Sequence, residues 1–162
     1  MIKNLAEEAL QKGGGRIPIP IVDIAQEYDL AIYEIEMSVL GNQTPSGILT
    51  QRENKWFIAI NKNDVAVRKR FTIAHEIGHF LLHKNQRFID DFRFGETFYR
   101  SHSEDNQLEK EANYFAANLL MPESYVKKKW EELHNVTEMA KSFDVSEVSM
   151  TFRLKNLGLI EA

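Results

Sequence analysis

The 162-residue sequence contains no cysteine. Disulfide bonds and thiolate metal sites are therefore excluded, and any metal must be held by His, Asp or Glu side chains. The sequence also has no uninterrupted apolar run of about 18 residues, which a membrane-spanning helix needs. Residues 1–15 contain an acidic stretch and no apolar segment of the kind found in a signal peptide. We therefore expect a cytoplasmic protein with no membrane partner.

An excess of positive charge is missing as well, because the formal net charge is −4 at pH 7. A general nucleic-acid binder needs a positive field that attracts phosphate groups, so direct binding of nucleic acid is not expected. The composition, 43% hydrophobic and 27% charged, is typical of a folded globular protein. The length favours a single domain over residues 1–162.

Hydrophobic periodicity predicts an α+β fold with a helical C-terminal half. Arg52, Glu53 and Asn54 stand between two β-rich runs as a tight turn, which favours a small antiparallel sheet. A central helix is expected from a cap at Asn63 or Asp64 to about residue 84, packed on that sheet. The other expected helices are 3–12, 20–28, 107–121, 123–133, 136–143 and 146–157, and the expected strands are 31–36, 47–51 and 56–60. We divide the domain into N-terminal helices and sheet (1–62), metal-site helices with an intervening loop (63–121) and a helical tail (122–162).

The central helix contains the sequence HEIGH at residues 75–79. His75 and His79 are four residues apart, so they share one helical face and both imidazoles can reach a single ion. Glu76 lies beside them in a position suited to a general base. A catalytic zinc site generally has three protein ligands and one open position for water, so a third ligand is expected elsewhere.

Two glutamates of the helix 107–121 are candidates for the third ligand. On a helical wheel Glu109 falls between Ala116 and Leu120 of the apolar stripe and faces inward. Glu111 lies at the other border, where an ordinary solvated carboxylate is expected. A buried carboxylate that faces two histidines is best explained by a cation between them. We predict Glu109 as the ligand, with Glu111 as the alternative.

The remaining histidines fit the site less well. His83 is separated from His75 by about 12 Å of helix rise, which is too far for both to bind one ion, so it is expected to support a ligand or to pack. His102 and His134 belong to no spacing pattern and are expected in loops or on the surface. The aromatic-rich segment 85–106 is a candidate cleft wall, from which Tyr99 or His102 could steady an oxyanion.

The sequences RKRFTIAHEIGHFLLH at 68–83 and EKEANYFAANLLMP at 109–122 resemble the ImmA/IrrE family of metallopeptidases. The resemblance implies His75, His79 and Glu109 as metal ligands. It also implies a substrate class, because family members cleave helix-turn-helix transcriptional repressors. Two His and one carboxylate suit Zn2+, although Mn2+ or Fe2+ can bind the same set.

The residues and the resemblance together predict a metal-dependent endopeptidase whose partner is a DNA-binding repressor. Glu76 takes a proton from the metal-bound water and delivers it to the leaving amine. One alternative is a non-catalytic metal-binding regulator or a toxin-antitoxin type interaction protein.

A second alternative is DNA binding through the tail, where residues 139–154 have the outline of a helix-turn-helix. Arg153 and Lys155 supply little positive charge there, and the apolar residues of the tail suit packing against the rest of the protein. These residues are Met139, Phe143, Val148, Phe152 and Leu157. A structural or substrate-docking role is therefore favoured over DNA binding.

Overall fold

The computed structural model describes residues 1–37, 47–84, 92–93, 96–97 and 105–162. In the described part of the chain, no helix combines the length and the apolar character needed to cross a membrane. The elements in chain order are α1 (Ile2–Lys12), α2 (Ile21–Glu27), β1 (Ala31–Ile35), β2 (Gly47–Arg52), β3 (Lys55–Asn61), α3 (Ala66–His83), β4 (Phe92–Arg93), β5 (Glu96–Thr97), α4 (Asp105–Leu120), α5 (Glu123–Leu133), α6 (Val136–Phe143) and α7 (Glu147–Asn156). The predicted α+β class with a helical C-terminal half is confirmed.

The three-stranded sheet has the order β1-β3-β2 and is mixed. Strand β2 pairs antiparallel with β3, and the connecting residues Glu53 and Asn54 have φ angles of 50° and 62°, as in a type I′ hairpin turn. Strand β1 pairs parallel with β3, so the prediction of an antiparallel sheet is wrong for this pair. Only strands joined by a tight turn have their relative direction determined by local sequence, and β1 has no such turn with β3.

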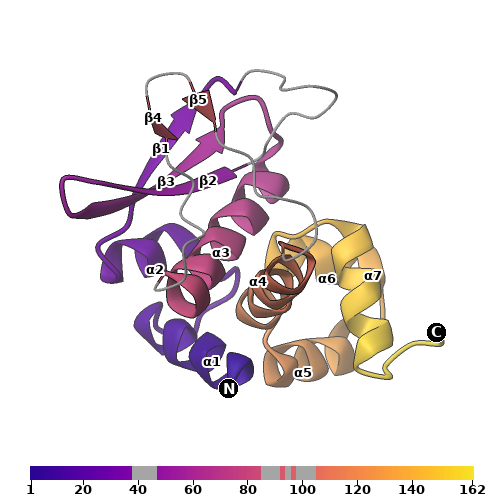
Figure 1. The fold of residues 1–162 in the computed structure, drawn as a ribbon. Coiled ribbons are helices and arrows are strands. Elements are labelled where there is room, and N and C mark those ends of the chain that lie inside the picture. Colours follow the sequence, from indigo (N-terminus) through magenta and orange to yellow (C-terminus); the bar gives the residue numbers. More distant parts are fainter. Residues whose placement is uncertain (38–46, 85–91, 94–95, 98–104) are drawn as a thin grey trace.

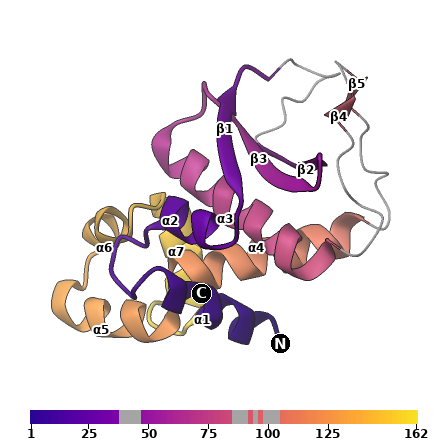
Figure 2. The same ribbon diagram turned by 90° about the vertical axis from the view of Figure 1, so that its left-hand side faces the viewer.

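Helix α3 lies between the sheet and α4 (Figures 1 and 2). Its predicted cap at Asn63 or Asp64 is wrong, because the N-cap residue is Val65 and no side chain caps the helix. The Asn61 side chain instead accepts a hydrogen bond of 3.0 Å from the backbone N–H of Asn63, within the turn that precedes the helix. The polar residues that precede α3 therefore serve the turn at the strand end instead of the helix start.

A close approach between α3 and α4 is made possible by Gly78 of the HEIGH sequence. A Cβ atom at this position would lie 3.2 Å from the Cα of Ala112 and 3.0 Å from the Phe115 ring. Both distances are tighter than ordinary van der Waals contact. Glycine therefore lets the two helix backbones pack closely at the level of His75 and His79.

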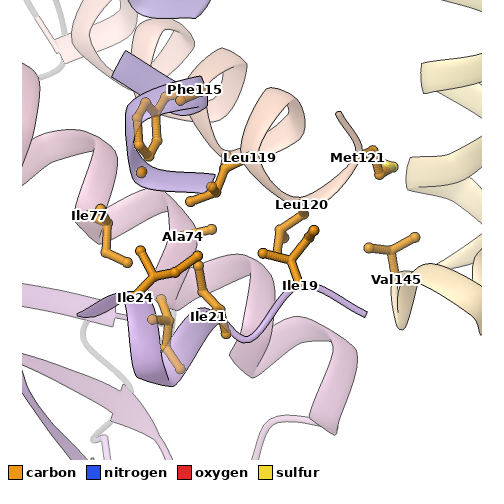
Figure 3. Close-up of a cluster of buried hydrophobic side chains, with 14 of the residues drawn as sticks. Ile19, Ile21, Ile24, Ala74, Ile77, Phe115, Leu119, Leu120, Met121 and Val145 are labelled. Carbon is orange, nitrogen blue, oxygen red and sulfur yellow. The ribbon is translucent and has the colours of Figure 1, made fainter. Parts of the chain in front are cut away.

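The largest cluster of buried side chains connects α2, α3 and α4 (Figure 3). Ala74 and Ile77 of α3 lie in one cluster with Phe115 and Leu119 of α4, and all four residues are fully buried. The labelled cluster further includes Ile19, Ile21, Ile24, Leu120, Met121 and Val145. This packing sets the position of α4 against α3 without using the polar residues of either helix.

The helical tail packs on the end of α4 and is tied to it by a charged side chain. Arg153 of α7 is buried and donates hydrogen bonds to the Met121 carbonyl at 2.9 Å and to the Asn118 Oδ1 at 3.1 Å. Val148 and Phe152 are 66% and 63% exposed, so the prediction that they pack inward is wrong. Helix α7 faces the core with Met150, Arg153 and Leu154, which places Val148 and Phe152 on its opposite side.

Candidate metal centre

Three side chains, two from α3 and one from α4, converge where these helices pack together. The Nε2 atoms of His75 and His79 are 3.0 Å apart. Each of them lies 3.0 Å from one carboxylate oxygen of Glu109, His75 from Oε2 and His79 from Oε1. The helical spacing of four residues brings the two histidines together, and the packing of α4 brings Glu109 to both.

These three side chains fit a divalent metal by their chemistry and by their spacing. Their ligand atoms all lie within 4.8 Å of one another. Donor atoms around a tetrahedral zinc ion with bonds of about 2 Å stand about 3.3 Å apart, which small side-chain adjustments of this group would reach. No second group of three such side chains occurs among the residues that the structure describes.

The electrostatics of the group favour an ionised Glu109. Burial raises the pKa of Glu109, but its hydrogen bonds from His75 and His79 outweigh burial and hold this pKa well below the usual value. Burial likewise lowers the pKa of His75, but the hydrogen bond to Glu109 and the charges of Glu76 and Glu109 outweigh it and raise the pKa. A cation at this point would replace the proton that the histidines otherwise hold against the carboxylate.

Glu76 is buried next to His75 on α3 and lies beside the start of β2. A Cβ atom at Gly47 would stand 3.1 Å from the Oε1 of Glu76 and would overlap the methyl group of Thr72. Glycine at the first residue of β2 thus leaves room for the Glu76 carboxylate. The strand can approach the helix closely because this position carries no side chain.

Both histidines are held at their second ring nitrogen by residues of α3 and α4. The Nδ1 of His75 lies 2.8 Å from Oδ1 of Asn113, a residue that sequence reasoning did not single out. The spacing of four between Glu109 and Asn113 was the available signal, because it places both on one face of α4. The Nδ1 of His79 lies 3.0 Å from the Nδ1 of His83.

The structure separates the two glutamates that the sequence left as candidates. Glu109 meets His75 and His79, whereas Glu111 accepts hydrogen bonds of 3.0 Å from His83 and from Gln107. Glu111 is partly exposed to solvent, as expected, but its hydrogen bonds with His83 and Gln107 show that it is more than an ordinary surface carboxylate. Its position at the border of the apolar stripe was recognised, but the neighbouring His83 could not be seen from one helix alone.

The other polar residues considered from the sequence are not part of this group. His134 is exposed at the C-cap of α5. Tyr99 and His102 lie outside the described residues, as does most of the aromatic segment 85–106. A role for either residue in steadying an oxyanion stays a prediction.

Comparison with known proteins extends these observations. The model of a peptidase family, M78, described as the IrrE N-terminal-like domain, matches residues 29–155, a range that includes all of α3 and α4. No curated protein sequence gives a significant match. Among solved structures, a Mycobacterium tuberculosis transcriptional regulator superimposes with a TM-score of 0.67 over 95% of this chain at 14% sequence identity. The chain spans 46% of the length of that regulator, and the likeness shows a shared fold.

Proposed function

The chain belongs to the IrrE N-terminal-like family of M78 peptidases, and we propose that it is a metal-dependent endopeptidase that cleaves a helix-turn-helix transcriptional repressor. The observation that carries the proposal is the convergence of His75, His79 and Glu109 on one point, with Glu76 adjacent on the same helix. Two His and one carboxylate leave part of a metal's coordination shell open, which is the arrangement of a catalytic site and not of a closed structural one.

The metal ligands in this proposal are the Nε2 atoms of His75 and His79 and the carboxylate of Glu109. Zinc bound there would supply a Lewis acid that polarises the peptide carbonyl and makes water more acidic, and Mn2+ or Fe2+ could bind the same donors. Glu109 contributes a negative charge that stays ionised at neutral pH, because its hydrogen bonds lower its pKa.

Glu76 is the proposed general base. Its carboxylate accepts a proton from the attacking water and then returns this proton to the nitrogen of the leaving amine. The side chain is buried, being 4% exposed, and it approaches Thr72 and Gly47, so its position is restricted by packing. A base held in one place loses less entropy when the substrate binds.

The substrate class rests on charge and on the resemblance of the chain to repressor-cleaving peptidases. A protein with a formal net charge of −4 would attract a basic DNA-binding repressor by long-range electrostatics. Direct DNA reading by the tail is less favoured, because Arg153 is buried against Met121 and Asn118 and cannot reach phosphate groups.

The test compares metal content and cleavage of a helix-turn-helix repressor from the same genome for wild type, Glu76→Gln and Glu109→Ala. Wild type should hold about one metal per chain and cut the repressor. Glu76→Gln should keep the metal and cut about 10²–10⁴-fold more slowly, because it removes the base and little else. Glu109→Ala should lose the metal.

Glu131→Gln is a matched control, because it removes one exposed carboxylate from α5 and should change neither quantity. Cleavage by Glu76→Gln at the wild-type rate would contradict the assigned base. Bound metal without cleavage of the repressor or of any peptide would replace the peptidase by a non-catalytic regulator.

A further inference from the structure

A chain of hydrogen-bonded side chains leads from His79 away from the three candidate ligands. The Nδ1 of His79 meets the Nδ1 of His83 at 3.0 Å, and the Nε2 of His83 meets Oε2 of Glu111 at 3.0 Å. Gln107 donates to the other oxygen of Glu111, also at 3.0 Å. Both histidines are 4% exposed, so water has little access to their rings.

With a metal bound at the Nε2 of His79, the donors and acceptors along this chain can be assigned in only one order. An ionised carboxylate accepts hydrogen bonds and cannot donate them, so the Nε2 of His83 must carry a hydrogen. A metal on the Nε2 of His79 leaves the hydrogen of that ring at Nδ1, so the Nδ1 of His83 must accept this hydrogen bond. The remaining lone pair of His79 is at Nε2, the atom that faces Glu109 and His75.

We propose that Glu111 and His83 are positioning residues that set the tautomer and the ring orientation of His79 for metal binding. The inference rests on the proposed function in one respect, because it takes His79 as a metal ligand. Glu111 does not touch the metal in this assignment. It acts on His79 through His83, so one carboxylate at the protein surface determines the tautomers of two buried rings.

His75 shows why His79 needs this longer connection. An amide oxygen of α4, Oδ1 of Asn113, reaches the Nδ1 of His75 directly at 2.8 Å. His79 has a second imidazole in place of an amide, and an imidazole can offer either a donor or an acceptor at each nitrogen. The His83 ring therefore needs its own acceptor to define which nitrogen is which, and Glu111 provides it.

The first measurement is the zinc dissociation constant of the full chain, obtained by competition with a chromogenic chelator. Glu111→Ala should weaken zinc binding by about 10–100-fold, the usual effect of removing a group that orients a ligand. Glu111→Gln keeps an oxygen acceptor and should recover most of this loss. Glu131→Gln removes an equal charge from an exposed site on α5 and should have no effect.

A double-mutant cycle separates positioning from packing. If Glu111 acts only through His83, Glu111→Ala should cause no further loss of zinc affinity in a His83→Leu background. If the two residues act independently, the losses should add. Thermal unfolding of the zinc-free variants is measured in parallel, because a packing role would lower stability without this coupling in zinc affinity.

The second measurement is the tautomeric state of each histidine in the zinc-loaded protein, from NMR of ¹⁵N-labelled histidine rings. We expect His83 protonated at Nε2 and His79 protonated at Nδ1. In Glu111→Ala, His83 should become a mixture of tautomers. His83 protonated at Nδ1 in wild type would overturn the assignment.

The two proposals fail in different ways. Equal zinc affinity and unchanged tautomers in wild type and Glu111→Ala would refute the positioning role and leave the peptidase intact. The expected loss of zinc affinity in a protein that cuts no repressor and no peptide would refute the peptidase and leave the positioning role intact. A wild-type protein that binds none of Zn2+, Mn2+ and Fe2+ would contradict both.

Discussion

Two regions of this protein bury ionisable side chains, the α3–α4 pair and the helical tail of α5–α7, and the buried groups have different surroundings. In the α3–α4 pair, His75, His79 and Glu109 converge on a single point. In the tail, Arg153 of α7 is buried but its hydrogen bonds go to a backbone carbonyl and to the Asn118 amide. Burial of a charge therefore does not by itself identify a functional site. Convergence of several metal-binding atoms on one point is the observation that supports the proposed metal site.

The largest expected effect belongs to the tail and should leave the metal centre unchanged. Phe143 of α6 is fully buried, and Phe143→Ala should lower the free energy of unfolding by about 3–5 kcal/mol, because it leaves a cavity. Urea unfolding of the zinc-free protein measures this loss. The zinc dissociation constant of the folded variant should stay within about twofold of wild type. A parallel loss of zinc affinity would mean that the tail and the α3–α4 pair are coupled.

A smaller effect is expected from Arg153→Met, which keeps the apolar stem of the side chain and removes its donors. The Met121 carbonyl and the Asn118 oxygen would lose charged donors in a buried place, at a cost of about 2 kcal/mol in unfolding free energy. Lys155→Met on the exposed face of α7 is the matched control and should change stability by less than about 0.5 kcal/mol. Equal effects of the two variants would remove the structural role assigned to Arg153.

Zinc affinity at the proposed metal site should depend on pH. Burial lowers the pKa of His75, but the hydrogen bond to Glu109 and the charges of Glu76 and Glu109 outweigh it and raise the pKa. A proton and zinc compete for the same ring nitrogen, so zinc affinity should fall by about tenfold for each pH unit below the raised pKa. Chelator competition between about pH 5 and 8 measures this slope.

The stability of the zinc-free protein should depend on pH in the opposite direction and fall as the pH rises. Protonated His75 stabilises the fold fully below its unfolded-state pKa, and this contribution is lost as the pH rises through the raised folded-state pKa. His134→Gln, which removes an exposed histidine of α5, should alter neither dependence. Zinc affinity independent of pH would argue against His75 as a ligand.

The smallest effect is expected from the exposed apolar pair on α7. Val148→Ser and Phe152→Ser should each change the unfolding free energy by less than about 0.5 kcal/mol, because both side chains are more than half exposed. Zinc affinity should also be unchanged. An increase in KM for the repressor at unchanged kcat would show that these residues dock the substrate. A large loss of stability would mean that they are packed.

Most of the secondary structure could be predicted from the sequence, because it depends on local patterns. The helices 123–133 and 136–143 match α5 and α6 to the residue. The HEIGH spacing correctly placed His75 and His79 together, since residues four apart on a helix are neighbours wherever the helix lies. The hairpin at Glu53 and Asn54 was predictable for the same reason.

By itself the sequence determined which residues share a helical face, the tight hairpin and the two residue types, His and Glu, that suit a metal. Only the tertiary structure decided that β1 runs parallel to β3, that Glu111 meets His83, and that Val148 and Phe152 face outward. The physical reason is that helical and strand periodicities relate residues within one element. Contacts between elements depend on the packing of whole faces, to which distant parts of the chain contribute together.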